Sequence, residues 1–245
     1  MIGIAEEKTA LPVFRQIVVA LKNEIVSGSL AEHTALPSER AVAKAHGVSR
    51  MTARRALEVI EAEGLAYSKG RQGRFVSPER LDYGLSSMAN FISGSAEKGI
   101  EIDIELVNSR IRSADGRLAR ILSVPIDTQL FENTRVFSRS GHATFVETET
   151  VVSKLGNAQL CDIGSDQDVP EGQRRYGPLG HSADIVVRMR AFTPAEADLL
   201  GVMPYQTGIE QEQIVRDRGG IAFCFCHQIW RGEIAQFSAK AVLQG

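Results

Sequence analysis

Arg50 and Arg54 stand four residues apart in a segment that can read the edges of DNA bases. The segment runs from Gly47 to Leu57 as Gly-Val-Ser-Arg-Met-Thr-Ala-Arg-Arg-Ala-Leu. Two helical residues four apart share one face, and arginine can bind guanine through two hydrogen bonds in the major groove. The hydroxyls of Ser49 and Thr52 can reach phosphates or base edges beside them. A solvated basic helix face is the alternative interpretation.

The flanking residues predict the helix-turn-helix that would position these side chains. Ser38 follows a proline and can cap a short helix, and Gly47 allows the sharp turn that ends it. Ser49 caps a second helix, and Gly64 is placed to terminate it. Apolar residues recur at helical spacing on that second helix and predict its core face: Ala53, Ala56, Leu57 and Ile60.

A β-wing is predicted after the second helix, ending in Gly73-Arg74-Phe75-Val76. Two helices, their caps, a basic face and a wing then follow one another in the order that a DNA-binding domain requires. This order favours DNA binding over a plain basic surface.

Length and charge agree with a DNA-binding domain attached to a second domain. The chain has 245 residues, which favours two domains, and a net charge of −2. Residues 36–77 hold eight Lys/Arg against four Asp/Glu, whereas residues 78–245 hold seventeen against twenty-two. Basic charge therefore gathers at the motif, and the remaining chain is acidic.

Neither a membrane span nor a secretion signal is predicted, so we expect a cytoplasmic protein with no membrane partner. Three cysteines, Cys161, Cys224 and Cys226, are an odd number that does not fit a complete disulfide framework. Cys224, Cys226 and His227 could form a metal or redox site, but their spacing is not that of a zinc pair. We expect buried thiols, no metal and no cofactor.

Residues 11–77 resemble the DNA-binding domain of the GntR family of bacterial transcription regulators. The most specific matches are Leu36-Pro37-Ser38-Glu39-Arg40 and the string from Val48 to Leu57. The resemblance implies operator contacts from five residues: Arg40, Ser49, Arg50, Thr52 and Arg54.

The same resemblance implies that a glycine at the tip of the wing enters the minor groove. Arg71 stands where relatives often have that glycine, and it could insert into a narrow minor groove instead. Arg71 and Gly73 are the candidate wing contacts.

After residue 78, short alternating apolar stretches predict an α+β domain. An internal echo occurs at an offset of 78 residues, since Arg110-Ile111-Arg112 returns as Arg188-Met189-Arg190. Each copy predicts a strand, a short helix near 114–122 or 194–200, and a hairpin. Chance similarity is the alternative; a true repeat would give two similar halves in one antiparallel sheet.

The second half resembles the effector-binding domain of the HutC subfamily, called UTRA and built on the chorismate lyase fold. The likeness rests on the helix ending in Leu-Gly-Val, on Arg135 leading through Gly141 to Glu147, and on the closing Ile229-Trp230-Arg231-Gly232-Glu233. Related domains bind small acidic metabolites, often through an Arg-x-Arg pair. Here Phe137 replaces the second arginine.

The segment from Leu81 to Phe91 also resembles phosphonate-uptake regulators of this subfamily, which implies a phosphonate or related anion as effector. Arginine presents a planar fork that suits such oxygens. The candidate effector contacts are Arg135, Glu147, Arg175, His181, Arg188 and Trp230. Each arginine could instead lie on the surface or a strand edge, His181 in a loop and Trp230 in the core.

The expected architecture is a winged helix-turn-helix over residues 1–77, a linker over 78–84 and a UTRA-like domain over 85–245. We expect a repressor that binds palindromic double-stranded operator DNA as a homodimer and responds to a small anionic effector. The alternatives are a response to a sugar phosphate or an amino-acid catabolite, a lyase-like enzyme, and a structural DNA-binding protein. No catalytic residue is assigned, since no nucleophile elbow or phosphate loop occurs in the sequence.

Overall fold

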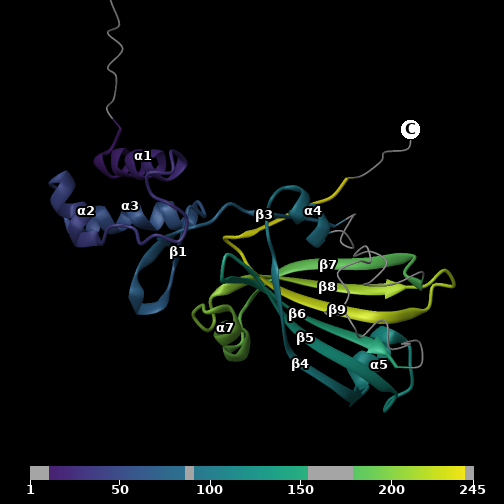
Figure 1. Ribbon diagram of the computed structural model, residues 1–245. Coiled ribbons are helices and arrows are strands. Elements are labelled where there is room, and N and C mark those ends of the chain that lie inside the picture. The colour runs from purple at the N-terminus through teal and green to yellow at the C-terminus, as the bar shows by residue number, and fades with distance from the viewer. Residues whose placement is uncertain (1–10, 86–90, 154–178, 241–245) are drawn as a thin grey trace, which may run out of the picture. The chain divides into compact units, whose positions relative to one another are not determined.

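The computed structural model describes residues 11–85, 91–153 and 179–240 (Figure 1). The chain divides into two compact units, Met1–Glu79 and Arg80–Gly245. None of the helices in the described ranges has the length and apolar character that a membrane crossing requires.

The first unit is built from three helices around one apolar core. The helices are α1 (Val13–Val26), α2 (Glu39–His46) and α3 (Arg50–Ala62). The core contains residues of α1 and α2 together with the predicted face of α3: Ile17, Val18, Leu21, Val42, Ala53, Ala56, Leu57 and Ile60. Burial of these side chains orients α3 and leaves its opposite face in solvent.

The predicted caps of the helix-turn-helix are confirmed. The Ser38 hydroxyl accepts a hydrogen bond from the Ala41 amide, and the Ser49 hydroxyl accepts one from the Thr52 amide at 3.1 Å. Gly47 adopts the left-handed conformation with φ of 62°, which turns the chain between the two helices.

A two-stranded wing follows α3. Strands β1 (Ala66–Ser68) and β2 (Arg74–Val76) pair antiparallel, with the 3₁₀ turn η1 (Gly70–Gln72) between them. Gly73 has φ of 110°, a conformation that side-chain-bearing residues rarely adopt. The wing is thus a short hairpin held at its base by ladder hydrogen bonds.

The second unit is centred on a six-stranded antiparallel sheet in the order β4-β5-β6-β9-β8-β7. Its strands are β4 (Asp103–Ser113), β5 (Gln129–Arg139), β6 (His142–Val152), β7 (Ser182–Ala191), β8 (Thr207–Arg216) and β9 (Ala222–Arg231). Its helices are α4 (Phe91–Glu97), α5 (Gly116–Leu122) and α7 (Pro194–Leu200). A small parallel pair joins β3 (Leu81–Gly84) to β10 (Ala235–Ser238).

The strand order confirms the predicted repeat. The first half contains β4, α5 and the hairpin β5–β6, and the second contains β7, α7 and the hairpin β8–β9. The halves join where β6 pairs with β9, and Thr148 lies opposite His227 there. Two similar halves therefore form one sheet, as the echo of Arg110-Ile111-Arg112 predicted.

Different elements pack on the two faces of the six-stranded sheet. On the helical face, α5 packs near Phe225 and α7 packs near Ile229. On the aromatic face, Phe145 stacks on Trp230 with ring centroids 3.8 Å apart. Apolar residues of β3, α4 and β10 join that aromatic cluster: Leu81, Tyr83, Phe91, Ile234 and Ala235. Each face therefore has its own core and its own polar groups.

Residues 78–84, predicted as a linker, differ from that prediction in their second half. Leu81 and Tyr83 are fully buried, and β3 pairs with β10. Leu81 and Tyr83 point to the core and Asp82 points to solvent, as in a half-buried strand. The strand that pairs with β3, β10, lies about 150 residues later in the chain. Residues from Arg80 onward belong to the second unit.

Candidate functional site

Helix α3 presents its basic side chains to solvent. The Arg50 side chain is 73% exposed, and its Nη2 lies 3.8 Å from Glu39 Oε2. The Arg54 side chain is 54% exposed, and its Nε donates to Glu58 Oε1 at 2.8 Å. Exposed pairs of this kind are worth less than about 1 kcal/mol, so both guanidinium groups can exchange these carboxylates for DNA.

The other predicted DNA contacts surround this helix. Arg40 on α2 is exposed, and Ser49 and Thr52 lie at the first turn of α3, with their hydroxyl oxygens 2.9 Å apart. Gly73 is exposed in the wing. The side chain of Arg71 lies outside the described residues. The helix N-terminus, the basic side chains and the wing form one candidate DNA surface on the first unit.

A buried polar cluster lies on the aromatic face of the second unit and contains two predicted effector contacts. Arg135 is 3% exposed, and its Nη1 lies 3.1 Å from Glu149 Oε2 and 3.6 Å from Glu147 Oε1. Gln228 donates to Glu147 Oε2 at 2.7 Å and to the Tyr83 hydroxyl at 3.1 Å. We call these residues, with Cys224, the Arg135 cluster.

Two carboxylates share the single guanidinium of Arg135. Burial raises the pKa of Glu149 above its ordinary value, although the charge and hydrogen bond of Arg135 oppose that effect. The Cys224 thiol also lies 3.9 Å from Glu149 Oε1. Arg135 is thus held by the protein's own carboxylates and is not a bare anion clamp.

Of the other predicted effector contacts, Trp230 borders this cluster, whereas His181 and Arg188 lie away from it. Trp230 is fully buried in the aromatic core, where its Nε1 donates to Gln228 Oε1 at 2.8 Å. His181 is exposed just before β7. Arg188 lies on the helical face, on the other side of the sheet from Arg135. Arg175 and Cys161 lie outside the described residues.

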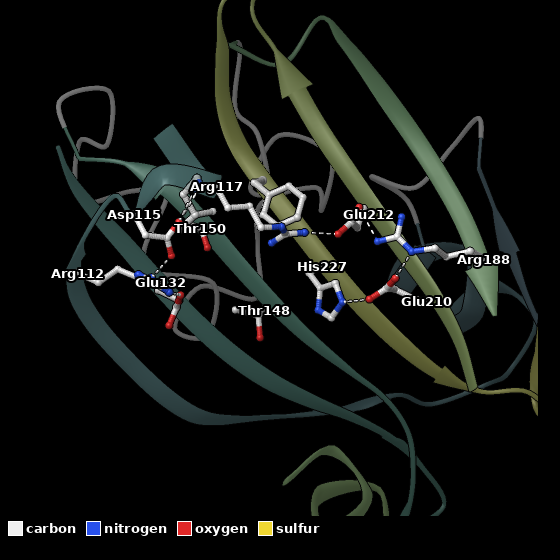
Figure 2. A pocket seen from close by; sticks show the side chains of 12 residues that line it. Arg112, Asp115, Arg117, Glu132, Thr148, Thr150, Arg188, Glu210, Glu212 and His227 are labelled. Carbon is white, nitrogen blue, oxygen red and sulfur yellow. Dashed lines mark hydrogen bonds and ion pairs between the residues drawn. The ribbon is translucent and has the colours of Figure 1, made fainter. Parts of the chain in front are cut away.

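A cleft of about 360 Å³ opens on the helical face (Figure 2). Thr148, Thr150, Phe225 and His227 line it from the two central strands, and the Arg117 guanidinium lies 5.1 Å from the Phe225 ring centroid. Figure 2 shows His227 between one charged cluster around Glu132 and another around Glu210.

The two charged clusters repeat the sequence echo in three dimensions. Glu132 accepts from Arg110 at 2.5 Å and from Arg112 at 2.9 Å. Glu210, 78 residues later, contacts Arg188 at 2.5 Å and Arg190 at 2.6 Å. In each half, one buried glutamate therefore receives two arginines from the neighbouring outer strand.

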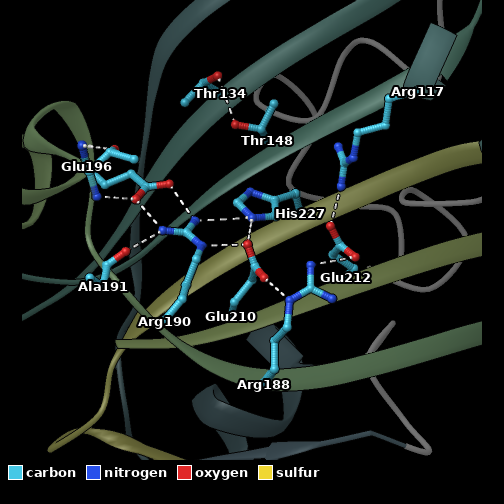
Figure 3. A network of polar contacts seen from close by, with 11 residues as sticks. Arg117, Thr134, Thr148, Arg188, Arg190, Ala191, Glu196, Glu210, Glu212 and His227 are labelled. Atoms are coloured by element: carbon cyan, nitrogen blue, oxygen red, sulfur yellow. Dashed lines mark hydrogen bonds and ion pairs between the residues drawn. The ribbon is translucent and has the colours of Figure 1, made fainter. Parts of the chain in front are cut away.

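The second cluster extends from the sheet to α7 (Figure 3). Arg190 contacts Glu196 at 2.7 Å, and His227 Nε2 lies 2.7 Å from Glu210 Oε1. Arg188 also reaches Glu212 at 2.9 Å, and Arg117 of α5 pairs with the same carboxylate. The cleft is lined by groups that already pair with one another, so we assign its network a structural role.

The pKa of Glu210 predicts acid-sensitive stability. Burial raises that pKa, but the hydrogen bonds and charges of Arg190 and His227 lower it by a larger amount, to about 2. A carboxylate with a depressed folded-state pKa stabilises the fold above its unfolded pKa of about 4.5 and loses that effect as the pH falls toward 2. The network should therefore weaken between these two pH values.

Glu210→Gln should lower the free energy of unfolding by about 2–3 kcal/mol at pH 7, and by roughly half of that at pH 3. Urea unfolding followed by the fluorescence of Trp230, the single tryptophan, measures this in the second unit. Glu105→Gln, an exposed carboxylate on β4, is the control and should change little. An equal loss at both pH values would assign the effect to packing and not to charge.

The sequence prediction named Glu147 but missed Glu149 and Gln228 in the Arg135 cluster, and of the residues that line the cleft it named only Arg188 as a contact. Glu149 carries one usable signal, since Glu147 and Glu149 alternate with threonines along β6 and therefore share one face of the strand. The sequence shows the repeat of the two arginines, but it did not identify Glu132 and Glu210 as their partners.

Both units match known families. Residues 14–76 match "Bacterial regulatory proteins, gntR family", and residues 97–236 match the UTRA domain. The first match covers the three helices and the wing, and the second covers the six-stranded sheet with α5 and α7.

Two similar proteins are named as repressors. The HTH-type transcriptional repressor NagR of Bacillus subtilis is 26% identical over 228 residues, which cover 93% of each chain. The mannosyl-D-glycerate transport/metabolism system repressor MngR of Escherichia coli is 27% identical over 125 residues, which cover 51% of this chain and 52% of that protein.

Solved structures share the fold. PhnF from Mycobacterium smegmatis superposes with a TM-score of 0.63 at 19% identity, covering 93% of this chain and all of that one. YydK from Bacillus subtilis gives 0.55 at 18% identity, covering 95% and 100%. The predicted α+β architecture, a winged helix-turn-helix followed by a UTRA-type antiparallel sheet, is confirmed.

The similar proteins are transcription regulators, which argues against the lyase-like alternative. The chain therefore belongs to the GntR family of bacterial regulatory proteins, in its HutC-type branch with a UTRA domain, and it is a transcription regulator and not an enzyme.

Proposed function

We propose that this regulator is a repressor that binds a palindromic operator as a homodimer and is released or recruited by a small metabolite. The observation that supports operator binding is the exposed basic face of α3, with Arg50 and Arg54 beside the wing. A single recognition helix reads few base pairs, and a symmetric dimer doubles the site.

The proposed DNA contacts are those of the predicted surface. Arg50 and Arg54 read base edges, Ser49 and Thr52 bind phosphate at the helix N-terminus, and Arg40 binds the flanking backbone. The wing, with Arg71 and Gly73, follows the adjacent minor groove.

The proposed effector site is the Arg135 cluster on the aromatic face. Buried side chains that offer a guanidinium, carboxylates and an amide suit a ligand carrying both an acidic group and hydrogen-bond donors. A sugar phosphate or sugar acid has both, whereas a simple phosphonate has few donors for Glu147 and Glu149. The system after which MngR is named handles such a sugar acid.

Selection of duplexes from a random pool by the purified full chain tests the DNA-binding part. We expect a two-fold symmetric site whose half-sites are about one helical turn, or roughly 34 Å, apart. An Arg50→Ala, Arg54→Ala double variant is the control and should enrich no sequence. Failure of the native chain to enrich a sequence would contradict operator binding.

A thermal-shift screen tests the effector part, with sugar phosphates, sugar acids, phosphonates and amino acids as probes. A true effector should raise the melting temperature with the logarithm of its concentration and should change the affinity for the selected duplex. Glu147→Gln should abolish that shift while leaving duplex binding intact. A shift that survives Glu147→Gln would place the site elsewhere.

A further inference from the structure

The outer strand β7 has the properties of a strand that pairs with another chain. It pairs with β8 without a register shift over ten residues, or roughly 33 Å. Among the described strands, none pairs with its other side. An unpaired edge of this length presents a row of backbone donors and acceptors and is often blunted by charged side chains, proline or a bulge. β7 has no proline and no bulge, and its charged residues, Asp184, Arg188 and Arg190, all form ion pairs within the sheet.

Apolar side chains of β7 are exposed on both faces of the strand. Val186 is 51% exposed, Val187 41% and Met189 73%. Exposed apolar residues in a row along a free edge are a liability for a monomer. They are explained if a further strand covers them.

We propose that β7 pairs antiparallel with β7 of a second copy of this chain, with the two-fold axis at Val186. This inference rests on the homodimer of the proposed function and states which surface forms it. The two sheets then continue into one sheet of twelve strands across the axis.

The charges on β7 are self-complementary in this register. When Val186 faces its own counterpart, Asp184 lies opposite the partner subunit's Arg188, and the reverse pair forms on the other side of the axis. Within its own chain Asp184 pairs with Arg216, and Arg188 pairs with Glu210 and Glu212. The two side chains are still 66% and 48% exposed on the helical face, so each can contact a second partner. Opposite charges directly across a strand pair are favourable.

Neighbouring registers are less favourable. An axis at Val187 would place Arg190 opposite Asp184; both arginines are held by two glutamates of their own chain, but Arg190 is only 26% exposed, against 48% for Arg188. An axis at Ile185 would place Arg188 opposite a serine. The Val186 register is the one that uses an accessible arginine.

The other outer strand is less suited to the same role. β4 also exposes apolar residues, with Leu106 at 58% and Ile111 at 62%. Its register with β5 shifts between Leu106 and Asn108, and such a bulge twists an edge and interrupts pairing. Pairing of β7 with β4 of another copy would leave free edges and grow an open chain, whereas β7 with β7 closes on itself.

Cysteine cross-linking tests the register directly. In the proposed dimer the two Cα atoms of residue 186 lie about 4.5–5.5 Å apart, within the range that a disulfide bridges. Val186→Cys should therefore give a disulfide-linked dimer under mild oxidation. Leu106→Cys and the native chain, which has three cysteines of its own, should remain unlinked.

A lysine placed at the two-fold axis tests the same surface without introducing a cysteine. Val186→Lys should raise the dimer dissociation constant at least tenfold in sedimentation experiments, because two lysines would face each other. Ile221→Lys, an exposed position in the turn between β8 and β9, should leave it unchanged. Circular dichroism checks that both variants fold.

The outcomes separate the surface from the proposed function. A native chain that is dimeric, cross-links through residue 106 and is insensitive to Val186→Lys would overturn the β7 surface and leave the dimeric repressor standing. A native chain that is monomeric both alone and on its selected duplex would overturn both.

Discussion

Arg50→Ala should lower operator affinity about 5- to 150-fold, which corresponds to roughly 1–3 kcal/mol, and should relax sequence preference at one position of each half-site. The side chain is 73% exposed and has only a weak contact with Glu39. Its removal therefore costs the free protein little, and the loss falls on the complex with DNA. Fluorescence anisotropy with selected and scrambled duplexes measures the difference.

Arg55→Ala is the matched control on the same helix. The Arg55 guanidinium lies 4.2 Å from the Phe14 ring centroid, so it packs on α1. This variant should change stability slightly and discrimination not at all. Equal loss on selected and scrambled duplexes in Arg50→Ala would show that Arg50 contacts only phosphate, and the salt dependence of binding should then fall by about one unit of slope.

Arg135→Met should lower the free energy of unfolding of the second unit by about 3–5 kcal/mol. The substitution keeps an apolar side chain of similar length but leaves two carboxylates buried without the guanidinium. Glu147 is fully buried and Glu149 is 2% exposed, so the substitution leaves both carboxylates in surroundings that solvate charge poorly. Urea unfolding followed by Trp230 fluorescence reports this loss.

Arg110→Met is the control for Arg135→Met. The Arg110 side chain pairs with Glu132 but is 55% exposed, and its loss should cost less than about 1 kcal/mol. The Arg135→Met defect should shrink when Glu149→Gln is added, because one of the two buried charges is then gone. A loss below 1 kcal/mol in Arg135→Met would contradict a charge-compensating role for Arg135.

These results would also bear on how the effector acts. A ligand that binds the Arg135 cluster meets a guanidinium already shared by Glu147 and Glu149. Its acidic group must compete with Glu149, whose raised pKa makes protonation and release of Arg135 easier than for an ordinary carboxylate. Effector binding can then shift the domain arrangement only through its differential affinity for the two states.

The DNA-binding half was predictable because its signals are local. A cap at Ser38, a left-handed glycine at Gly47 and a cap at Ser49 act within three or four residues. The apolar period of α3 follows from helix geometry alone. Exposure of Arg50 and Arg54 follows from the same period, since they lie opposite the buried face.

The sheet of the second half was predictable as a set of hairpins, and the offset of 78 residues gave its two halves. The grouping of its side chains was not predictable in the same way. Arg135 and Arg188 were expected to serve one ligand, yet they lie on opposite faces of the sheet. Trp230 was expected at the ligand or in the core; its ring stacks on Phe145, and its Nε1 donates to Gln228 of the Arg135 cluster.

The amino-acid sequence by itself determined the winged helix-turn-helix, the basic recognition face and the repeated strand order. Tertiary structure decided which polar groups meet, because β6 pairs with β9 across a long stretch of chain and brings Glu147 beside Gln228. Alternation along a strand tells which residues share a face, but it does not tell which strand lies next or what covers that face. The charge balance around Arg135 depends on those neighbours, and so it is a property of the folded sheet.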